Sequence, residues 1–402
     1  MTTLSTDGSK VVGYLKELIS MPSENPPGKT IELIEWLANK LKALGFFTKI
    51  LEPAPSKANL VAWKEGSSPG IMLLFNGHLD TVTVNEKHNW SFEPFEGTTS
   101  EDWVYGRGAA DEKGSFAALL LALESLNDMR FRKGVMVQAV CDEETMGPCG
   151  TAYLIKENYC KADAGIVIES SVRDGRSFLR IAMRGVMRLQ LETFGKAAHG
   201  SRPYAGVNAN LKMAKLLLNV EKTKFVHQNN GLYGSPTIST GTFLNGGHNF
   251  NVIPDYCIAF SDIRTVPGMT SRSVLKDVSE VIKKLNKHDD KMKAVVRVSE
   301  LFKPASISPR EPIVSLVKNT ARRVLKYTPV VERNEGATDA GLIINKARIP
   351  TIVGLGPGDV SLGNIHGSDE RVSIKALLEY SRLYSEIIKQ MNYTKEDEKR
   401  KT

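Results

Sequence analysis

The hydrophobic residues of this chain follow two spacings that predict helices and strands in alternation. Residues 28–46 carry apolar positions at helical spacing, whereas residues 70–77 form a short apolar run typical of a buried strand. An Ala- and Leu-rich helix is predicted over residues 111–128, followed by apolar strands at 133–144 and 163–170. Apolar strands that alternate with helices predict an α/β fold with a mainly parallel sheet flanked by helices.

The pattern changes over residues 185–298. The predicted elements there follow the order βαββαβ, which is typical of a ferredoxin-like unit. Beyond this segment the α/β pattern resumes, with the last helix expected over residues 373–391. We therefore expect a catalytic domain formed by residues 1–184 and 299–402, with an inserted lid or dimerisation domain at 185–298.

Length and composition support a two-domain soluble protein. The chain has 402 residues, which is long for a single hydrophobic core, and its apolar and charged fractions of 41% and 24% are ordinary. The net charge of +8 comes with interleaved acids and no recognition motif, so we expect no nucleic acid. We also expect no membrane span, and four cysteines without paired spacing suggest reduced thiols in the cytoplasm.

Histidine and acidic residues follow several of the predicted strands. Asp111 opens a helix after the glycine-rich YGRGAA, and the others come at strand ends or in the loop beyond the last strand: His78 with Asp80, Glu143 with Glu144, Glu169, and His366. Ligands of open α/β sheets bind at the carboxyl ends of the strands. Imidazoles and carboxylates without thiolates suit zinc or a similar divalent ion. Five ligands suit two ions about 3.5–4 Å apart with one bridging carboxylate, for which Asp111 is the natural candidate.

Each of these residues also has an ordinary explanation. His78 alone could be a hydrogen-bonded core histidine, the pair Glu143 and Glu144 a solvated turn, and His366 a loop residue. Glu169 is harder to explain in this way, because a carboxylate after an apolar strand risks burial without a partner. Together, the residues favour a dinuclear metal site.

Longer motifs carry a family resemblance. In chain order these are SMPSENPPG, GHLDTV, YGRGAADEKG, DEETMG, AAHGSRPYAGVNA, NVIPD with SDIR, and GATDAG. They resemble the co-catalytic metallo-amidohydrolases, which include acetylornithine deacetylase, succinyl-diaminopimelate desuccinylase, aminoacylase and the glutamate carboxypeptidases. The resemblance covers nearly the whole chain and is nearest to the deacetylase and desuccinylase branch.

The resemblance implies a role for each site residue. The metal ligands would be His78, Asp111, Glu144, Glu169 and His366. Glu143 would be the general base, and the Asp111–Glu112 peptide bond would be cis. The fourth ligand varies in the family between Asp and Glu. Glu169 is the commoner choice in aminopeptidase-like and aminoacylase-like members, which weakens an assignment to the desuccinylase.

The expected mechanism is hydrolysis by a metal-bound hydroxide. Zinc lowers the pKa of a bound water to about 7. Glu143 would take the proton from this water and pass it to the leaving amine. We expect the Asp80 carboxylate to lie on the far ring nitrogen of His78, where it would fix the imidazole tautomer.

Substrate and partner contacts rest on the resemblance. It implies substrate contacts for Arg184, Asn251, Arg264 and Thr338, and a His199 that reaches the active site of the partner in a homodimer. An arginine would suit an α-carboxylate. Alternatively, Arg264 pairs with Asp262, Asn251 forms a turn before Pro254, and His199 is an ordinary residue at a helix start.

Three functions remain open at this point. The first is hydrolysis of N-acyl amino acids, such as N-acetylornithine or N-succinyl-diaminopimelate. The alternative on the same scaffold is a dipeptidase or carboxypeptidase that acts on short peptides. The third is a non-catalytic binding protein, which a complete set of ligands and a base disfavours. For the two enzymes we expect two divalent ions, Zn2+ first, with Co2+ or Mn2+ as alternatives.

Overall fold

The chain folds into two compact units in a computed structural model that describes residues 5–85, 87–227, 231–334 and 336–392. The first unit contains the chain up to Met183, Ser306–Asn334 and the residues from Thr338 onward. The second contains Arg184–Ala305 and a short piece after Asn334. Among the described residues, no helix is long and apolar enough to cross a bilayer.

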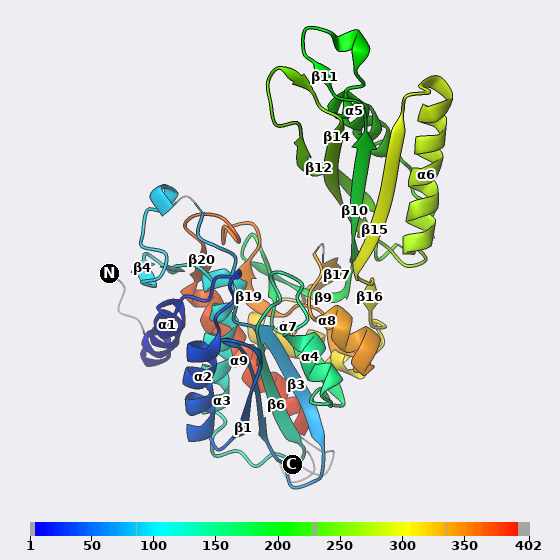
Figure 1. The fold of residues 1–402 in the computed structure, drawn as a ribbon. Coiled ribbons are helices and arrows are strands. Elements are labelled where there is room, and N and C mark those ends of the chain that lie inside the picture. The colour runs from blue at the N-terminus through cyan, green and yellow to red at the C-terminus, as the bar shows by residue number, and fades with distance from the viewer. Residues whose placement is uncertain (1–4, 86, 228–230, 335, 393–402) are drawn as a thin grey trace. The chain divides into compact units, whose positions relative to one another are not determined.

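A six-stranded sheet forms the centre of the first unit (Figure 1). Its order is β1 (Phe47–Ala54), β2 (Lys57–Lys64), β6 (Gly134–Val140), β3 (Ile71–His78), β7 (Ala164–Val167) and β18 (Thr351–Ile352). The four strands from β6 to β18 are parallel, and β1 and β2 add an antiparallel edge. The expected α/β fold with a mainly parallel sheet is therefore confirmed.

Helices cover this sheet because its central strands are apolar on both faces. Strands β3 and β6 are buried almost throughout, which is typical of a parallel sheet between helical layers. Helix α3 (Gly114–Glu124) is buried from Gly114 to Leu123 and packs against α1 (Thr6–Ile19) and α9 (Ile374–Asn392). Helix α2 (Ile31–Ala43) packs against β1 and β2, and α7 (Pro312–Leu325) packs against α9.

Shorter elements complete the first unit. A second sheet contains β8 (Ser170–Arg173), β9 (Arg176–Met183), β17 (Val330–Asn334) and β19 (Gly356–Asp359), with β16 (Ala305–Ser306) at its edge. A third sheet joins β4 (Thr98–Ser100), β5 (Trp103–Tyr105) and β20 (Arg371–Ser373). The short helices are η1 (Lys87–Asn89), η2 (Ala109–Lys113), α4 (Thr151–Lys156), α8 (Ala340–Leu342) and η4 (Ile343–Ala347).

The second unit has the chain order βαββαβ. Its elements are β10 (Gly185–Phe194), α5 (Ala209–Val220), β12 (Thr237–Gly246), β14 (Tyr256–Thr265), α6 (Ser271–His288) and β15 (Lys293–Phe302). The strands form one antiparallel sheet in the order β12-β14-β10-β15 (Figure 1). Strand β14 alternates buried and more exposed residues, as expected of a sheet with one covered face. Strand β15 continues to Phe302, so this unit extends beyond residue 298.

Two small features accompany the sheet of the second unit. A short ribbon pairs β11 (Ala198–His199) with β13 (Val252–Ile253), and η3 (Pro203–Ala205) follows β11. Helix α6 begins with a capping box in which Thr270 and Ser273 satisfy each other's main-chain N–H groups. Its buried residues Val274, Val278 and Ile282 recur at the spacing of one helical face.

Candidate metal centre

The end of strand β3 brings an imidazole against two carboxylates from other segments. His78 is the last residue of β3 and is only 2% exposed. Its Nε2 atom lies 3.1 Å from Oδ1 of Asp111 and 3.5 Å from Oε1 of Glu169. With Glu112, these residues form a group whose ligand-type atoms all lie within 4.8 Å of one another. We call this the His78 group.

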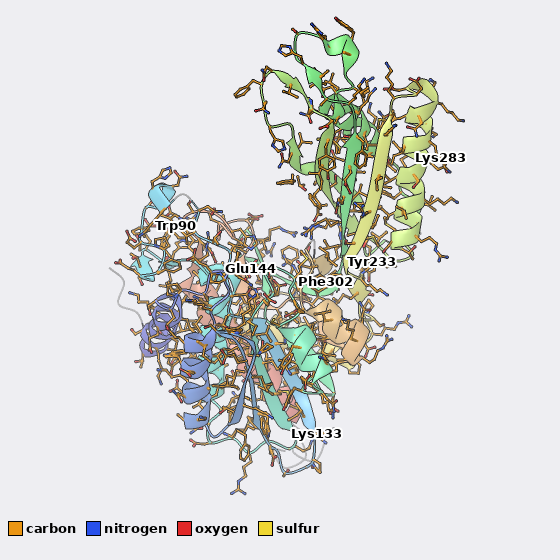
Figure 2. The ribbon with its side chains drawn as sticks, in the orientation of Figure 1. Trp90, Lys133, Glu144, Tyr233, Lys283 and Phe302 are labelled. Carbon is orange, nitrogen blue, oxygen red and sulfur yellow. The ribbon has the colours of Figure 1, made fainter. Side chains whose placement is uncertain are left out.

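A second group uses the other oxygen of the same aspartate. His366 places Nε2 3.3 Å from Oδ2 of Asp111 and 3.2 Å from Oε2 of Glu144. These three residues form a second set of potential ligands, which we call the His366 group. Asp111 therefore directs one carboxylate oxygen to each group, which is the geometry of a carboxylate that bridges two cations. Glu144 of this group is labelled in the first unit in Figure 2.

The local chain conformation explains how Asp111 comes to lie between the groups. Asp111 and Glu112 interrupt the short helix η2 with non-helical dihedral angles directly before helix α3. The peptide bond between them is cis, as the family resemblance implied. The carboxylate of Glu370 holds the preceding loop, because it accepts hydrogen bonds from Arg107 and from the main-chain N–H groups of Gly108, Ala110 and Asp111.

The electrostatics of the two groups fit bound cations. Burial alone would lower the pKa of His78, but the surrounding carboxylates, Glu112 first, raise it well above its ordinary value. The pKa of His366 rises to about 10, mainly through its hydrogen bonds to Asp111 and Glu144. Glu112 is fully buried, and its Oε2 atom has no hydrogen-bond partner in the structure. Buried carboxylates at this density require positive charge, and an oxygen and nitrogen donor set suits zinc-like divalent ions.

Asp80 makes a different contact from the one expected. The Nδ1 atom of His78 lies 2.9 Å from the main-chain oxygen of Asp80, whereas the Asp80 carboxylate is 3.7 Å away. The main-chain carbonyl is therefore the nearer acceptor for Nδ1, and orientation of the imidazole by the Asp80 carboxylate stays a prediction. The Asp80 carboxylate instead accepts the N–H groups of Glu143 and Glu144, each at 3.2 Å.

Glu143 lies beside the two groups without belonging to either of them. It follows strand β6 in a loop, and its main-chain N–H is held by Asp80. Burial is the main cause that raises the pKa of its carboxyl well above the ordinary value, and Glu169, Asp339 and Glu144 add to this effect. An acid with this environment is suited to accept and return a proton.

The sequence prediction missed two acidic residues near the centre. Glu112 belongs to the His78 group, and its Oε1 accepts the main-chain N–H of His78 at 2.6 Å. Its adjacency to Asp111 was an available signal. Glu370 was also not predicted, although it follows His366 by four residues. Its contacts to the loop of Asp111 bridge some 260 positions of the chain, so no local pattern reveals them.

The predicted substrate residues divide between the two units. Thr338 belongs to the first unit and is 2% exposed, and its hydroxyl donates to the carbonyl of Val353 at 3.2 Å. In the second unit, Arg184 donates to the carbonyl of Tyr233 and Arg264 pairs with Asp262 at 2.7 Å.

The other two predicted residues lie at the β11–β13 ribbon of the second unit, where His199 ends β11 and Asn251 directly precedes β13. His199 is exposed, with Nδ1 2.7 Å from the hydroxyl of Ser201, and the main-chain carbonyl of Asn251 accepts the N–H of Gly200. Substrate contacts by these residues and by the three above stay predictions.

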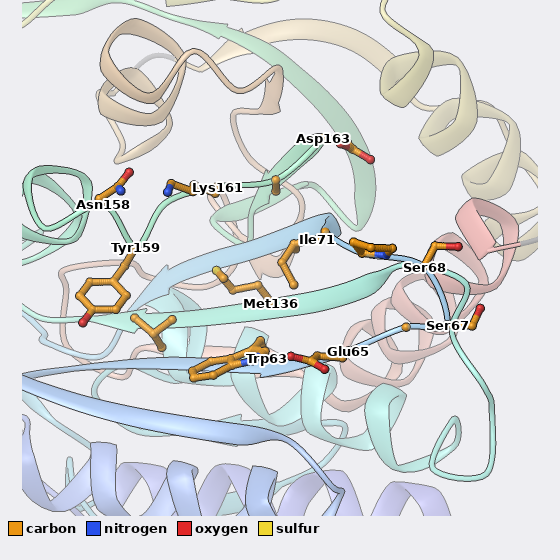
Figure 3. Close-up of a pocket in the computed structure, with 15 residues that line it drawn as sticks. Trp63, Glu65, Ser67, Ser68, Ile71, Met136, Asn158, Tyr159, Lys161 and Asp163 are labelled. Carbon is orange, nitrogen blue, oxygen red and sulfur yellow. The ribbon is translucent and has the colours of Figure 1, made fainter.

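A separate cavity of about 880 Å³ lies near the amino ends of the parallel strands (Figure 3). Ile71 at the start of β3, Trp63 and Met136 form its apolar floor, and Tyr159 and Lys161 line it from the loop before β7. None of its lining residues belongs to the His78 or His366 group. The cavity is therefore distinct from the metal centre, which lies at the carboxyl ends of these strands.

Comparison with known proteins identifies the family. The model of peptidase family M20/M25/M40 matches residues 74–390. An N-formyl-4-amino-5-aminomethyl-2-methylpyrimidine deformylase from Bacillus subtilis is 26% identical, with 94% of each chain covered. An acetylornithine deacetylase from Buchnera aphidicola is 29% identical over 96% of this chain and 99% of its own. The crystal structure of an M20 family metallo-carboxypeptidase from Sulfolobus solfataricus superimposes with a TM-score of 0.81 at 19% identity, covering 97% of this chain and all of that chain.

The chain belongs to peptidase family M20/M25/M40. It is accordingly a metal-dependent hydrolase of linear amide bonds, of the metallopeptidase type.

Proposed function

We propose that this enzyme hydrolyses the amide bond of N-acyl amino acids and releases a small acyl group, as in N-acetylornithine or N-succinyl-diaminopimelate. The observation that carries the proposal is the pair of ligand groups that share Asp111, with Glu143 held beside them. Two of its relatives are a deformylase and a deacetylase, both of which by name remove a small acyl group. The four cysteines are free, which suits a reducing compartment, and we place the enzyme in the cytoplasm.

The protein residues divide the chemistry between them. His78 and Glu169 would hold one ion, Glu144 and His366 the other, and Asp111 both. Two divalent ions, with Zn2+ as the first choice over Co2+ and Mn2+, would supply a polarised carbonyl and an acidified water. Glu143 accepts the proton of the attacking water and returns it to the amine as the amide bond breaks. The main-chain carbonyl of Asp80 keeps His78 in the tautomer that leaves Nε2 free to bind metal.

The second unit supplies the residues that we assign to substrate and partner. Strand β12 is an edge strand, and its Phe243 and Leu244 are exposed, as are Leu211 and Leu218 of helix α5. Edge strands with exposed apolar residues invite pairing, and pairing across a two-fold axis produces an isologous dimer. We assign this surface to a homodimer.

In such a dimer we assign His199 to the active site of the partner. There its imidazole would donate a hydrogen bond to the oxyanion that develops on the scissile carbonyl group. We assign Arg184, Asn251, Arg264 and Thr338 to substrate contacts, where an arginine suits the α-carboxylate of an N-acyl amino acid.

A peptidase function is the second candidate, because the family is named for peptidases and includes the metallo-carboxypeptidase whose fold this chain shares. A dipeptidase or carboxypeptidase would use the same ions and base. The two functions differ in the group on the carbonyl side of the scissile bond. An acyl amino acid presents an acyl group without an α-amino group there, and a dipeptide presents a positively charged α-amino group.

A substrate panel tests the proposal. Enzyme loaded with Zn2+, Co2+ or Mn2+ is given N-formyl-, N-acetyl- and N-succinyl-amino acids and, in parallel, dipeptides with the same C-terminal residues. Release of free amine is measured, with the Glu143→Ala variant as the blank. A higher kcat/KM for the acyl amino acids supports the deacylase, and a higher value for dipeptides supports the alternative. If metal-loaded enzyme hydrolyses neither class, both assignments are wrong.

A further inference from the structure

The motif SMPSENPPG, residues 20–28, contains no member of either ligand group and does not contain the base. Its residues 23–25 run beside the loop that follows strand β3. The hydroxyl of Ser23 donates to the carbonyl of Leu79 at 2.6 Å, and the N–H of Thr81 donates to the carbonyl of Ser23 at 3.1 Å. The N–H of Asn25 donates to the carbonyl of Thr81 at 2.8 Å. The motif is therefore hydrogen-bonded to the loop that begins after His78.

The side chain of Asn25 reaches from this segment to two different loops. It is 5% exposed, and its amide nitrogen lies 2.8 Å from Oδ2 of Asp80 and 3.1 Å from Oδ1 of Asp142. The hydroxyl of Thr145 is also within reach, at 3.2 Å. An amide nitrogen carries two protons, so it can donate to both carboxylates at once. Asn25 thereby connects the loop after β3 with the loop after β6.

The two carboxylates that Asn25 contacts hold the loop of the tandem acids. Asp80 accepts the main-chain N–H groups of Glu143 and Glu144. Asp142 begins this loop with a left-handed backbone, φ +70°, and accepts the N–H of Cys149 at 3.2 Å, which closes the loop at its far end. Lys57 forms an ion pair with Asp142, but Asp80 has no such counter-charge among the hydrogen bonds and ion pairs of the described residues other than His78.

We propose that Asn25 is a positioning residue of the metal centre, which sets the placement of Glu144 in the His366 group and of Glu143 beside it. It acts through Asp80 and Asp142, and the hydrogen bonds of its side chain reach no member of either ligand group. The effect on turnover rests on the proposed function. The effect on metal binding rests only on the ligand groups.

The neutral amide is essential to this role. Asp80 and Asp142 are both buried, at 0% and 3% exposure. An aspartate at position 25 would match the amide in shape but would place a third carboxylate against the other two, and like charges at hydrogen-bond distance repel. An alanine would simply remove the donor. The two substitutions should therefore displace the same loop to different degrees, with Asn25→Asp the more severe.

Metal titration distinguishes this role from a general loss of stability. Metal-free wild type, Asn25→Ala and Asn25→Asp are titrated with Co2+, with the visible spectrum and the dialysed metal content as readouts. Glu144→Gln and Glu169→Gln serve as references for weakening of the His366 and the His78 group. Asn127→Asp, an exposed position in the same unit, is the control for the added negative charge.

We expect both Asn25 variants to reproduce the pattern of Glu144→Gln. One ion binds as in wild type and the other about 10–100-fold more weakly, as for other residues that orient a ligand. Turnover should fall by a similar factor, with KM nearly unchanged, while Asn127→Asp behaves as wild type. Should Asn25→Asp not fold, Asn25→Ala decides alone.

Two results would overturn the proposal. One is equal weakening of both ions, which indicates a general structural role. The other is a wild-type titration curve. Because the titration needs no substrate, a failure of the substrate panel leaves this test intact. If the wild-type enzyme is an active deacylase and Asn25→Ala binds both ions as the wild type does, only the role of Asn25 is rejected and the proposed function stands.

Discussion

At the residue scale, the candidate metal centre depends on carboxylates that lie close together and perform different tasks. Asp111 faces both groups, Glu144 faces one, and Glu143 faces neither. The tandem acids can divide in this way because Asp80 fixes both of their N–H groups, so the main chain between them is held rigidly. Chemistry and metal binding should therefore be separable by single substitutions.

Replacement of Glu143 by alanine should abolish most turnover without loss of metal. Only the group that moves the proton is removed, and such a loss costs about 10²–10⁴ in kcat. Metal content per chain and kcat for the best substrate of the panel are measured together. Glu157→Ala, an exposed acid of the same unit, is the control. Near wild-type kcat with metal bound would show that Glu143 is not the base.

Replacement of Asp111 by alanine should release both ions, because each ligand group loses a member. Glu169→Ala provides the matched comparison, since it removes a ligand from the His78 group only and should leave one ion in place. Metal analysis after dialysis checks both variants. Two ions per chain in Asp111→Ala would rule out the bridging role.

At the element scale, the parallel strands are what assemble the site. Their apolar runs and the βαββαβ order were readable from hydrophobic spacing, and so were the residues at the strand ends. The antiparallel edge strand β1 was not, because all of its residues are exposed or half-buried and no alternation marks it. Strands β8, β17 and β19 are four or five residues long, too short for periodicity to identify.

The contacts between loops were likewise beyond prediction. Asp80 was correctly placed near His78, but whether its side chain or its carbonyl meets the imidazole depends on the loop after β6, which competes for the carboxylate. Glu370 and Asn25 act across long sequence separations. Sequence patterns thus pointed to the residues of the His78 and His366 groups, while the residues that hold these groups in place became visible only in three dimensions.

Glu370 should be a strong determinant of stability, because it and Arg107 form a buried ion pair at 2.6 Å with both side chains at most 2% exposed. Glu370→Gln leaves Arg107 without its counter-charge, and removal of one partner of a buried pair costs about 3–5 kcal/mol. The pair of exposed Lys375 and half-buried Glu379 is the control, and Glu379→Gln should cost about 0–1 kcal/mol. Urea denaturation of the metal-free proteins measures both. Equal losses of unfolding free energy in the two variants would contradict the stabilising role of the buried ion pair between Glu370 and Arg107.

At the scale of the whole molecule, the four free cysteines report on the native packing. Burial raises the pKa of Cys160 to about 12 and the pKa of Cys141 still further above its ordinary value, and Cys257 is also buried. Because a raised pKa reduces the thiolate fraction, these three thiols should react slowly with a disulfide reagent at pH 8. Burial and the nearby Asp142 carboxylate raise the pKa of Cys149 as well, but Cys149 is the one that is partly exposed and therefore open to the reagent.

We therefore expect one fast-reacting thiol per native chain and four after denaturation. The Cys149→Ser variant should lose the fast phase. A fast phase that persists in this variant would show that one of the buried cysteines is accessible in solution.

The last prediction concerns the proposed homodimer and the role of His199 in it. The ribbon of the second unit carries His199, exposed and bonded at Nδ1 to Ser201. If its Nε2 donates to the oxyanion in the partner's active site, His199→Ala should lower kcat by about 10²–10³. Metal content should not change, because His199 belongs to neither ligand group. His248→Ala, another exposed histidine of the second unit, should retain kcat near the wild-type value.

Complementation between chains tests the in-trans role directly. The His199→Ala chain keeps a complete metal centre and base, and the Glu143→Ala chain keeps its histidine. In a mixed dimer one of the two sites would then combine Glu143 of one chain with His199 of the other. We expect co-refolded mixtures with excess Glu143→Ala to recover activity that neither variant shows alone, and the activity to elute at the size of a dimer. An active species that elutes as a monomer, or mixed dimers without recovery, would place His199 outside the chemistry.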